Sequence, residues 1–280
     1  MKREPYIINP SELSYICYHC NYLKQNYNYF NSGVPAGVTQ TLDGMEKEFF
    51  LGDSKKIDES IPDGETINPF NNTFYTRVLE DNKDRPFRIK GKCDALIKFN
   101  DKTSGIIDYK TSKYEKNPFK DKDSFKREDL EEKIKQYDPQ LHCYDLLYRN
   151  LETDVEFLKW QHKNSYPNTK DMSKIADGAK KLQAKSEIVK IQKTSLMGLF
   201  FISPKNMEST RQMNINFAYK YRKVEIKQEA FMKFLTAYID ILYQKAPPPY
   251  PEDCGVKKCF SHKFFYDEKK LIKEGKRRNR

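Results

Sequence analysis

Two apolar runs rich in β-branched residues give the middle of the chain its clearest pattern. Residues 87–99 (FRIKGKCDALIKF) and 105–110 (GIIDYK) are typical of strands, and a short polar segment at 100–104 separates them. The pattern therefore predicts a β-hairpin. Alternate residues of a strand point to one face, so we expect Asp108 and Lys110 to lie side by side near its end. They form either an ordinary ion pair at a strand end or half of an active site.

The pattern after the hairpin predicts a mixture of helices and strands. Helical spacing begins at Glu128, and Asp138 followed by Pro139 indicates that a second helix begins there. The later elements that the pattern predicts are strands at 155–162, 199–202 and 215–226 and an amphipathic helix at 228–243. The order strand, strand, helix, strand favours an α/β fold.

Changes in composition divide the chain into regions. The first 85 residues are often interrupted by Gly, Pro, Asp and Asn; we expect helical patches at 11–30 and 42–50 and a loop at 64–73. The remaining predicted regions are a core at 86–245 with a polar insertion or surface helix at about 164–194, a cysteine-bearing segment at 246–268 and a basic tail at 269–280.

Charge and hydropathy restrict the class of protein. The formal net charge of the 280 residues is +11, which indicates either a lysine-rich surface or a polyanionic partner such as nucleic acid. No stretch approaches the ~20 apolar residues that span a bilayer, and the first residues contain no apolar signal-peptide core. We therefore expect a soluble cytoplasmic protein with no membrane partner.

The hairpin brings further chemistry to the same place. Asp94 lies in the first run, and a turn at 100–104 sets it opposite Asp108 and Lys110. Carboxylate oxygens are the ligands that Mg²⁺ prefers. Phosphodiester hydrolysis needs such an ion to generate hydroxide and to neutralise the developing charge. A neighbouring lysine can position the attacking water or stabilise that charge.

Three motifs in order over residues 90–148 resemble the PD-(D/E)XK nuclease superfamily, and within it the RecB-like branch. They are G-x-x-D ending at Asp94, D-x-K at Asp108 to Lys110, and Q-x-x-x-Y from Gln140 to Tyr144. The resemblance implies a restriction-endonuclease-like core, a central mixed β-sheet flanked by helices. It implies an Mg²⁺- or Mn²⁺-dependent deoxyribonuclease, an exonuclease acting on single-stranded DNA or free ends, working with a helicase, recombination or CRISPR-adaptation complex.

The same resemblance assigns roles to individual residues. Asp94, Asp108 and the backbone carbonyl of Tyr109 would be metal ligands, and Lys110 the catalytic lysine. Gln140 and Tyr144, one helical turn apart, would hold the lysine or the nucleic-acid backbone. Taken alone, these two residues are more typical of a polar helix edge with a core tyrosine, and only their place after the D-x-K motif favours the functional role.

One departure from the branch concerns an early helix. Relatives often have a metal-binding histidine there, several residues after a glycine, whereas residues 44–48 (GMEKE) contain none. We expect Glu48, or as a second choice Glu46, to serve the same ion. The alternative is a solvated acid on a charged helix.

Four cysteines near the two ends form two close pairs. Cys17 and Cys20, with Cys254 and Cys259, suit a tetrahedral zinc site or a 4Fe–4S cluster equally well, and His19 or His262 could replace one ligand. Some RecB-like nucleases carry an iron–sulfur cluster that joins the two ends of the chain, held by one early and three late cysteines. Here it would form a Cys-stapled lobe that joins the two ends. Unliganded cysteines are the alternative; Cys93 and Cys143 are expected in the core.

A basic segment follows the D-x-K motif. The residues expected to contact nucleic acid there are Lys113, Tyr114, Lys116, Lys120, Lys126 and Arg127. An aromatic ring in this segment could stack on unpaired bases, and the lysines could attract phosphates. A solvated loop is the simpler alternative.

Two other functions compete with the nuclease. The fold could serve as a non-cleaving nucleic-acid-binding or assembly subunit; the absent histidine favours this, whereas the intact D-x-K motif argues against it. A zinc-stapled protein-interaction module would leave the order of the three motifs unexplained.

Overall fold

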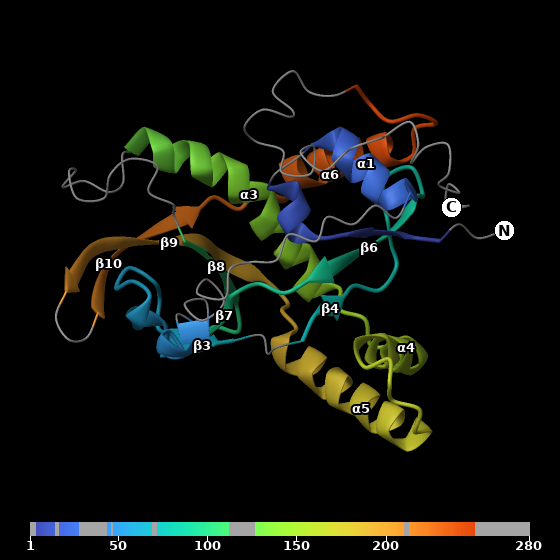
Figure 1. Ribbon diagram of the computed structural model, residues 1–280, viewed down its shortest axis with the longest axis horizontal. Helices are drawn as coiled ribbons and strands as arrows, with labels where there is room; N and C mark the ends of the chain where they lie inside the picture. Colours follow the sequence, from blue (N-terminus) through green and yellow to red (C-terminus); the bar gives the residue numbers. More distant parts are fainter. Residues whose placement is uncertain are drawn as a thin grey trace.

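The computed structural model describes residues 4–14, 17–27, 44–45, 47–68, 72–111, 127–209 and 213–249 of the chain, with the backbone alone at 111, 127–130, 203–209 and 213–218. Within these residues, helices lie on both sides of a central sheet (Figure 1). None of the described helices is long and apolar enough to cross a membrane.

The central sheet is mixed, with strand order β10-β9-β8-β7-β3-β2. Its strands are β2 Gly52–Asp53, β3 Gly64–Ile67, β7 Ala95–Phe99, β8 Ser104–Thr111, β9 Thr194–Ser209 and β10 Met213–Val224. Strands β8 and β9 are parallel, whereas the other neighbours are antiparallel. A parallel pair needs a long crossover, and α3 (Arg127–Arg149) lies in the segment that connects β8 to β9. The expected α/β class with a central mixed sheet is therefore confirmed.

Apolar residues alternate along the central strands, so each face of the sheet has its own core. On one face, Ile106 and Phe201 pack with residues of α3 and α6 (Gln228–Leu242). On the other face, Ile107 and Phe200 pack with Phe50, Ile57 and Ile61. The segment that carries those last three residues includes the short helix η2 (Ser54–Lys56).

A smaller sheet joins the beginning of the chain to its middle. Strand β1 (Tyr6–Ile8) pairs in parallel with β6 (Pro86–Gly91), which also pairs with β4 (Phe74–Tyr75) and β5 (Leu79–Glu80). The short helix η1 (Pro10–Leu13) follows β1 and packs against α3. Helix α1 (Tyr18–Tyr27) then packs against α6 (Figure 1).

Buried polar contacts fix the position of α3, the helix that carries the Q-x-x-x-Y motif. The carboxylate of Asp145 accepts hydrogen bonds from Thr194 at the start of β9 and from Gln228 at the start of α6. His142 Nε2 accepts a hydrogen bond from the backbone N–H of Lys227 at 2.8 Å. Since Asp145 and His142 are buried, these contacts hold α3 against both elements.

The expected single strand over residues 87–99 is wrong, because the chain breaks after Gly91. Strand β6 belongs to the smaller sheet, whereas β7 begins at Ala95 and belongs to the central one. The hairpin itself is confirmed, since β7 and β8 pair antiparallel around the turn. The break places Asp94 directly before β7.

The strand expected at 155–162 is also wrong, because this segment forms the helix α4 (Val155–Ser165). Asp154 caps the helix by accepting a hydrogen bond from the N–H of Phe157 at 2.8 Å. Leu158 and Gln161, three residues apart, are the buried side chains. The apolar spacing of this segment fits a strand as well as a helix. The hydrogen bond from Phe157 to Asp154 stabilises the first turn of the helix and so favours the helix.

The predicted helix start at Asp138 and Pro139 is wrong, because α3 continues through both residues. A proline inside a helix removes one backbone N–H, here the donor for the carbonyl of Lys135. Lys135 is exposed, so water can take the place of that donor.

The loop expected at 64–73 is wrong over its first residues, where β3 pairs with β7. Gly64 indicated a turn, but its role is close packing: a Cβ there would lie 2.7 Å from the backbone oxygen of Lys98. Within 164–194, α5 (Met172–Val189) packs against α4 through Ala179 and Leu182. The strands expected at 199–202 and 215–226 and the helix at 228–243 correspond to β9, β10 and α6, with β10 ending at Val224.

Candidate active site

Two aspartates meet where β7 begins beside the second half of β8. The register pairs Ala95 with Ile107, so Asp94, just before β7, lies next to Asp108. Oδ2 of Asp94 accepts a hydrogen bond from the backbone N–H of Tyr109 at 2.8 Å. The hairpin therefore brings both predicted carboxylates to one place.

The carboxyl of Asp108 lies in an environment that opposes its ionisation. It is 2% exposed, and burial, together with the charge of Asp94, raises its pKa to about 7 although Lys110 acts in the opposite direction. Its Oδ2 forms an ion pair with the Lys110 ammonium, but no hydrogen bond of good geometry reaches this oxygen from the described part of the chain. The site thus holds two close acids, one of them incompletely satisfied.

Lys110 is held next to these acids by helix α3. Its Nζ donates a hydrogen bond to Oε1 of Gln140 at 3.0 Å and lies 4.2 Å from the centre of the Tyr137 ring. The side chain is 17% exposed. The ammonium is therefore fixed beside Asp108 and still reachable from solvent.

Gln140 and Tyr144 form a buried chain of hydrogen bonds behind the lysine. Oε1 of Gln140 also accepts a hydrogen bond from the Ser14 hydroxyl at 2.8 Å, and its Nε2 donates to the Tyr144 hydroxyl at 3.0 Å. Burial, followed by the charges of Asp108 and Asp94, raises the pKa of Tyr144 well above its usual value. Tyr144 therefore stays protonated. Its hydroxyl holds Gln140, and Gln140 in turn holds Lys110.

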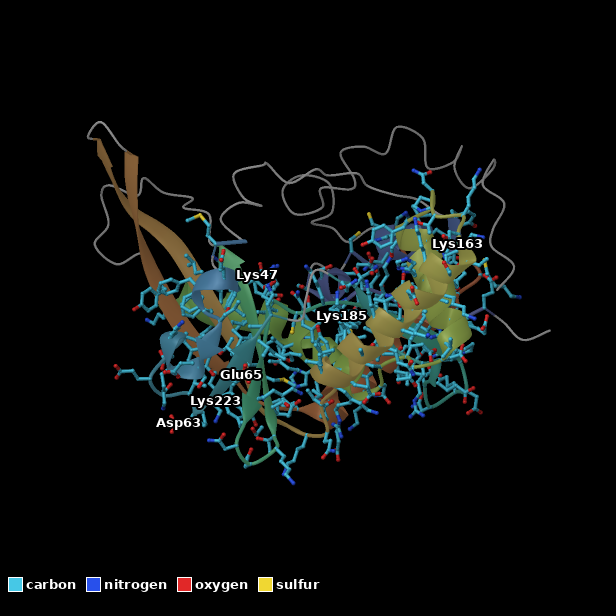
Figure 2. The ribbon with its side chains drawn as sticks, turned by 90° about the horizontal axis from the view of Figure 1, so that it is seen from below. Lys47, Asp63, Glu65, Lys163, Lys185 and Lys223 are labelled. Carbon is cyan, nitrogen blue, oxygen red and sulfur yellow. The ribbon has the colours of Figure 1, made fainter. Side chains whose placement is uncertain are left out.

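A second lysine, Lys47, forms an ion pair with Asp94. Nζ of Lys47 lies 2.8 Å from Oδ1 of Asp94, and its side chain is 11% exposed. Figure 2 shows Lys47 at the end of the central sheet. Phe50, three residues later, packs on the Tyr109 ring with centroids 5.6 Å apart. Helical spacing turns Lys47 and Phe50 towards the sheet, while Glu48 is exposed and does not join the carboxylates.

Several predicted residues lie outside the described part of the chain. These are Glu46, Lys113, Tyr114, Lys116, Lys120, Lys126, Cys254, Cys259 and the side chain of Arg127. Cys17 and Cys20 are described; both are buried at the start of α1. Cys93 and Cys143 are buried in the core, where we expected them.

The oxygen donors of the site fit a hard divalent cation such as Mg²⁺ or Mn²⁺. Asp94 and Asp108 would hold the ion, with the backbone carbonyl of Tyr109 as a further candidate. No third His, Cys, Asp or Glu completes a metal-binding cluster among the residues that the structure describes. This set leaves positions for water, which Mg²⁺ usually keeps.

Three residues of the site escaped the sequence analysis: Ser14, Tyr137 and Lys47. Nothing in the pattern marks Ser14, which is distant in sequence from Gln140. Tyr137 lies outside the three motifs. Lys47 could have been found, because it lies three residues before the apolar Phe50. The prediction favours Glu48 for its place after Gly44 and for the carboxylate that it offers the ion.

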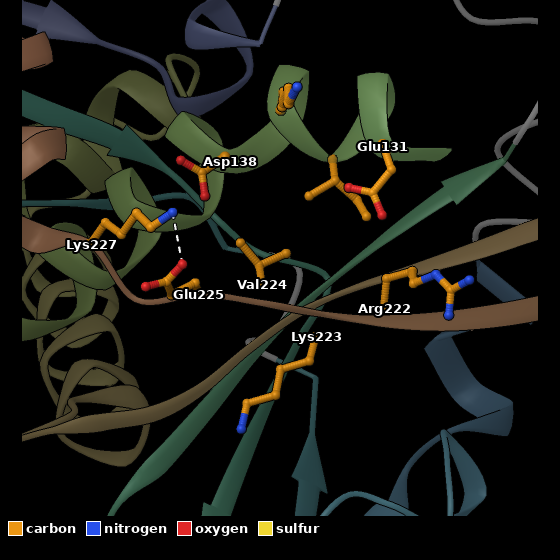
Figure 3. Close-up of a pocket in the computed structure, with 9 residues that line it drawn as sticks. Glu131, Asp138, Arg222, Lys223, Val224, Glu225 and Lys227 are labelled. Carbon is orange, nitrogen blue, oxygen red and sulfur yellow. Dashed lines mark ion pairs between the residues drawn. The ribbon is translucent and has the colours of Figure 1, made fainter. Parts of the chain in front are cut away.

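A pocket of about 740 Å³ lies between α3 and the end of β10, on a side of α3 away from Gln140 and Tyr144 (Figure 3). Its lining residues are Glu131, Ile134, Lys135, Asp138, Arg222, Lys223, Val224, Glu225 and Lys227. At 100° per residue, Glu131 and Asp138 leave α3 on a different side from Gln140 and Tyr144. The pocket is therefore separate from the carboxylates.

Comparisons with known proteins identify the family of the chain. Seven chains of solved structures match; one is the crystal structure of SSO0001, with a TM-score of 0.40, 14% identity, and coverage of 88% of this chain and 81% of that one. No curated protein matches the chain. Residues 42–246, more than half of the sequence and including every residue of the three motifs, match the PD-(D/E)XK nuclease superfamily. The chain therefore belongs to the PD-(D/E)XK nuclease superfamily.

Proposed function

We propose that the protein is an Mg²⁺- or Mn²⁺-dependent deoxyribonuclease of the RecB-like branch, an exonuclease that acts on single-stranded DNA or free ends. One observation carries the proposal: Asp94 and Asp108 lie side by side with the Lys110 ammonium held against them by Gln140. Paired acids with a fixed lysine match what metal-assisted phosphodiester hydrolysis requires.

The residues of the site have distinct roles in this reaction. The bound ion would activate water and neutralise charge on the phosphate. Asp94 and Asp108 hold the cation, and Lys110 positions the attacking water or stabilises the developing negative charge. Gln140 and Tyr144 keep the lysine in place; they are positioning residues.

The charge of the protein supports a nucleic-acid substrate. The formal net charge is +11, which favours binding to a polyanion. We propose that Lys113, Tyr114, Lys116, Lys120, Lys126 and Arg127 contact the DNA next to the site. Binding that depends on phosphate contacts weakens as salt rises.

The cysteine pairs support a second, structural metal. We propose that Cys17, Cys20, Cys254 and Cys259 hold zinc or a 4Fe–4S cluster that joins residues 246–268 to the N-terminal region. We also propose that the protein acts in the cytoplasm with a helicase, recombination or CRISPR-adaptation complex, in agreement with the RecB-like motifs.

Cleavage of end-labelled single- and double-stranded DNA in Mg²⁺, Mn²⁺ or EDTA tests the proposal. Wild-type protein should cleave only with a divalent metal. Asp108→Asn and Lys110→Met should each lower the rate about a hundredfold or more. Lys193→Met, which changes an exposed lysine at the other end of β8 and β9, should cleave like wild type.

The same assay distinguishes an exonuclease from an endonuclease, and both from a protein that binds DNA without cutting it. Stepwise shortening of the label would indicate an exonuclease, and internal fragments an endonuclease. A wild-type protein that binds DNA but never cuts it with either metal would instead be a non-cleaving nucleic-acid-binding or assembly subunit.

A further inference from the structure

The candidate site contains as many positive as negative groups. Lys110 forms an ion pair with Asp108, and Lys47 forms one with Asp94. With all four ionised, their charges sum to zero. A divalent cation entering this cluster would meet no net attraction. If the ammonium of Lys47 left, the remaining three groups would carry one negative charge.

Both oxygens of Asp94 already accept a contact. Oδ2 accepts the N–H of Tyr109, and Oδ1 lies 2.8 Å from Nζ of Lys47. Mg²⁺ binds carboxylate oxygen at about 2.0–2.1 Å. An ion on Oδ1 would thus lie only about 4–5 Å from the ammonium, where a unit charge and a divalent charge repel strongly in a partly buried site.

We propose that Lys47 holds the cation position on Asp94 in the metal-free protein, and that metal binding displaces its ammonium. This inference rests on the proposed function, because it takes Asp94 and Asp108 as metal ligands. Lys47 is thus a positioning residue that sets the metal affinity of the site. A DNA phosphate entering the site offers the displaced ammonium a new partner.

The surroundings of Lys47 allow the side chain to move without unfolding its helical turn. Phe50 anchors the turn, packing against Tyr109 and against Phe200 with centroids 4.8 Å apart. The long, flexible stem of a lysine can swing its ammonium by several ångströms.

The test is the affinity for Mn²⁺, measured on the full chain without DNA by electron paramagnetic resonance of the unbound ion. Lys47→Met and Lys47→Gln remove the charge and should bind Mn²⁺ at least about tenfold more tightly than wild type. Lys47→Arg retains the charge and should stay within a factor of about three of wild type. Lys193→Met should be unchanged, which controls for the overall loss of one positive charge.

Thermal unfolding provides a second readout that does not depend on cleavage. In EDTA, Lys47→Met should unfold at a lower temperature than wild type, because Asp94 loses its counter-charge. In saturating Mn²⁺ its gain in unfolding temperature should exceed that of wild type, because ligand stabilisation grows with affinity.

The outcomes separate this inference from the proposed function. If wild type binds Mn²⁺ and both neutral variants bind it equally or more weakly, Lys47 does not compete with the metal and the inference is overturned while the metal centre stands. If neither wild type nor the variants bind Mn²⁺, the metal centre itself is overturned, and the inference with it.

Discussion

At the scale of single residues, Asp108 links the stability of the metal-free protein to pH. Its pKa is raised from 3.8 to about 7, chiefly by burial and then by Asp94. Between these values the folded protein binds more protons than the unfolded chain, so this group makes stability fall as pH rises. We expect the unfolding temperature in EDTA to decrease from about pH 5 to pH 8.

Asp108→Asn provides the control for this pH dependence, because the amide has the same shape and does not titrate. The variant should lose the downward slope over that range. An equal slope in the variant and in wild type would assign the pH dependence to other groups.

A second residue-scale prediction concerns the hydroxyl of Tyr144. In Tyr144→Phe, Nε2 of the buried Gln140 loses its acceptor, so we expect the free energy of unfolding to fall by about 1–2 kcal/mol. Cleavage should also slow, because Gln140 holds Lys110. Urea unfolding and the cleavage assay measure the two effects. Tyr219→Phe, at a tyrosine that is 66% exposed, should change neither.

At the scale of elements, the pairing of β3 with β7 depends on a glycine. A Cβ at Gly64 would lie 2.7 Å from the backbone oxygen of Lys98, and a backbone atom cannot move aside as a side chain can. Gly64→Ala should therefore lower the free energy of unfolding by about 1–3 kcal/mol. Urea unfolding measures it, with Gly44→Ala as control, since a Cβ there meets nothing within 4 Å.

The same glycine shows why some elements could be predicted from sequence and others could not. The β7–β8 hairpin was predictable because two β-branched runs flank a polar turn, and this alone brings Asp94 to Asp108. Strand β3 was missed because its own residues resemble a loop. It is a strand because it pairs with β7, and that pairing exists only in the folded chain. Likewise, Pro139 marks a helix start in local terms, yet α3 continues because contacts such as that of Asp145 with β9 hold it in place.

The residues of the candidate site also fall into those that the sequence predicts and those that depend on contacts between distant parts of the chain. The residues on β8 and α3 were found through the resemblance to the nuclease motifs, because the order of the three motifs marks Gln140 and Tyr144 as well as Asp108 and Lys110. Ser14 contacts Gln140 from a distant part of the chain, and a local sequence pattern cannot predict such a contact. Lys47 and Glu48 are neighbours in sequence, so only the burial of Phe50 decides which of them faces the acids.

At the scale of the whole molecule, hydrogen bonds join the N-terminal region to the segment at the end of α6. The Tyr6 hydroxyl donates to the carbonyl of Leu242 at 2.9 Å, and the Tyr22 hydroxyl donates to that of Gln244 at 3.0 Å. Nδ1 of His19 contacts the carbonyl of Pro248 at 2.6 Å. Since His19 lies between Cys17 and Cys20, the early cysteine pair lies close to the segment that leads to Cys254.

A metal bound by the four cysteines would tie the two regions together more strongly than these hydrogen bonds. Protein purified without oxygen should therefore contain either about one zinc per chain or iron with acid-labile sulfide, measured by elemental analysis. Cys17→Ser with Cys20→Ser should lose this metal and unfold at a lower temperature, because structural metal binding adds directly to folding free energy. Cys93→Ser, which changes a buried core cysteine outside the two pairs, should retain the metal even if it is less stable. Wild-type protein isolated with neither zinc nor iron would show that the four cysteines are unliganded.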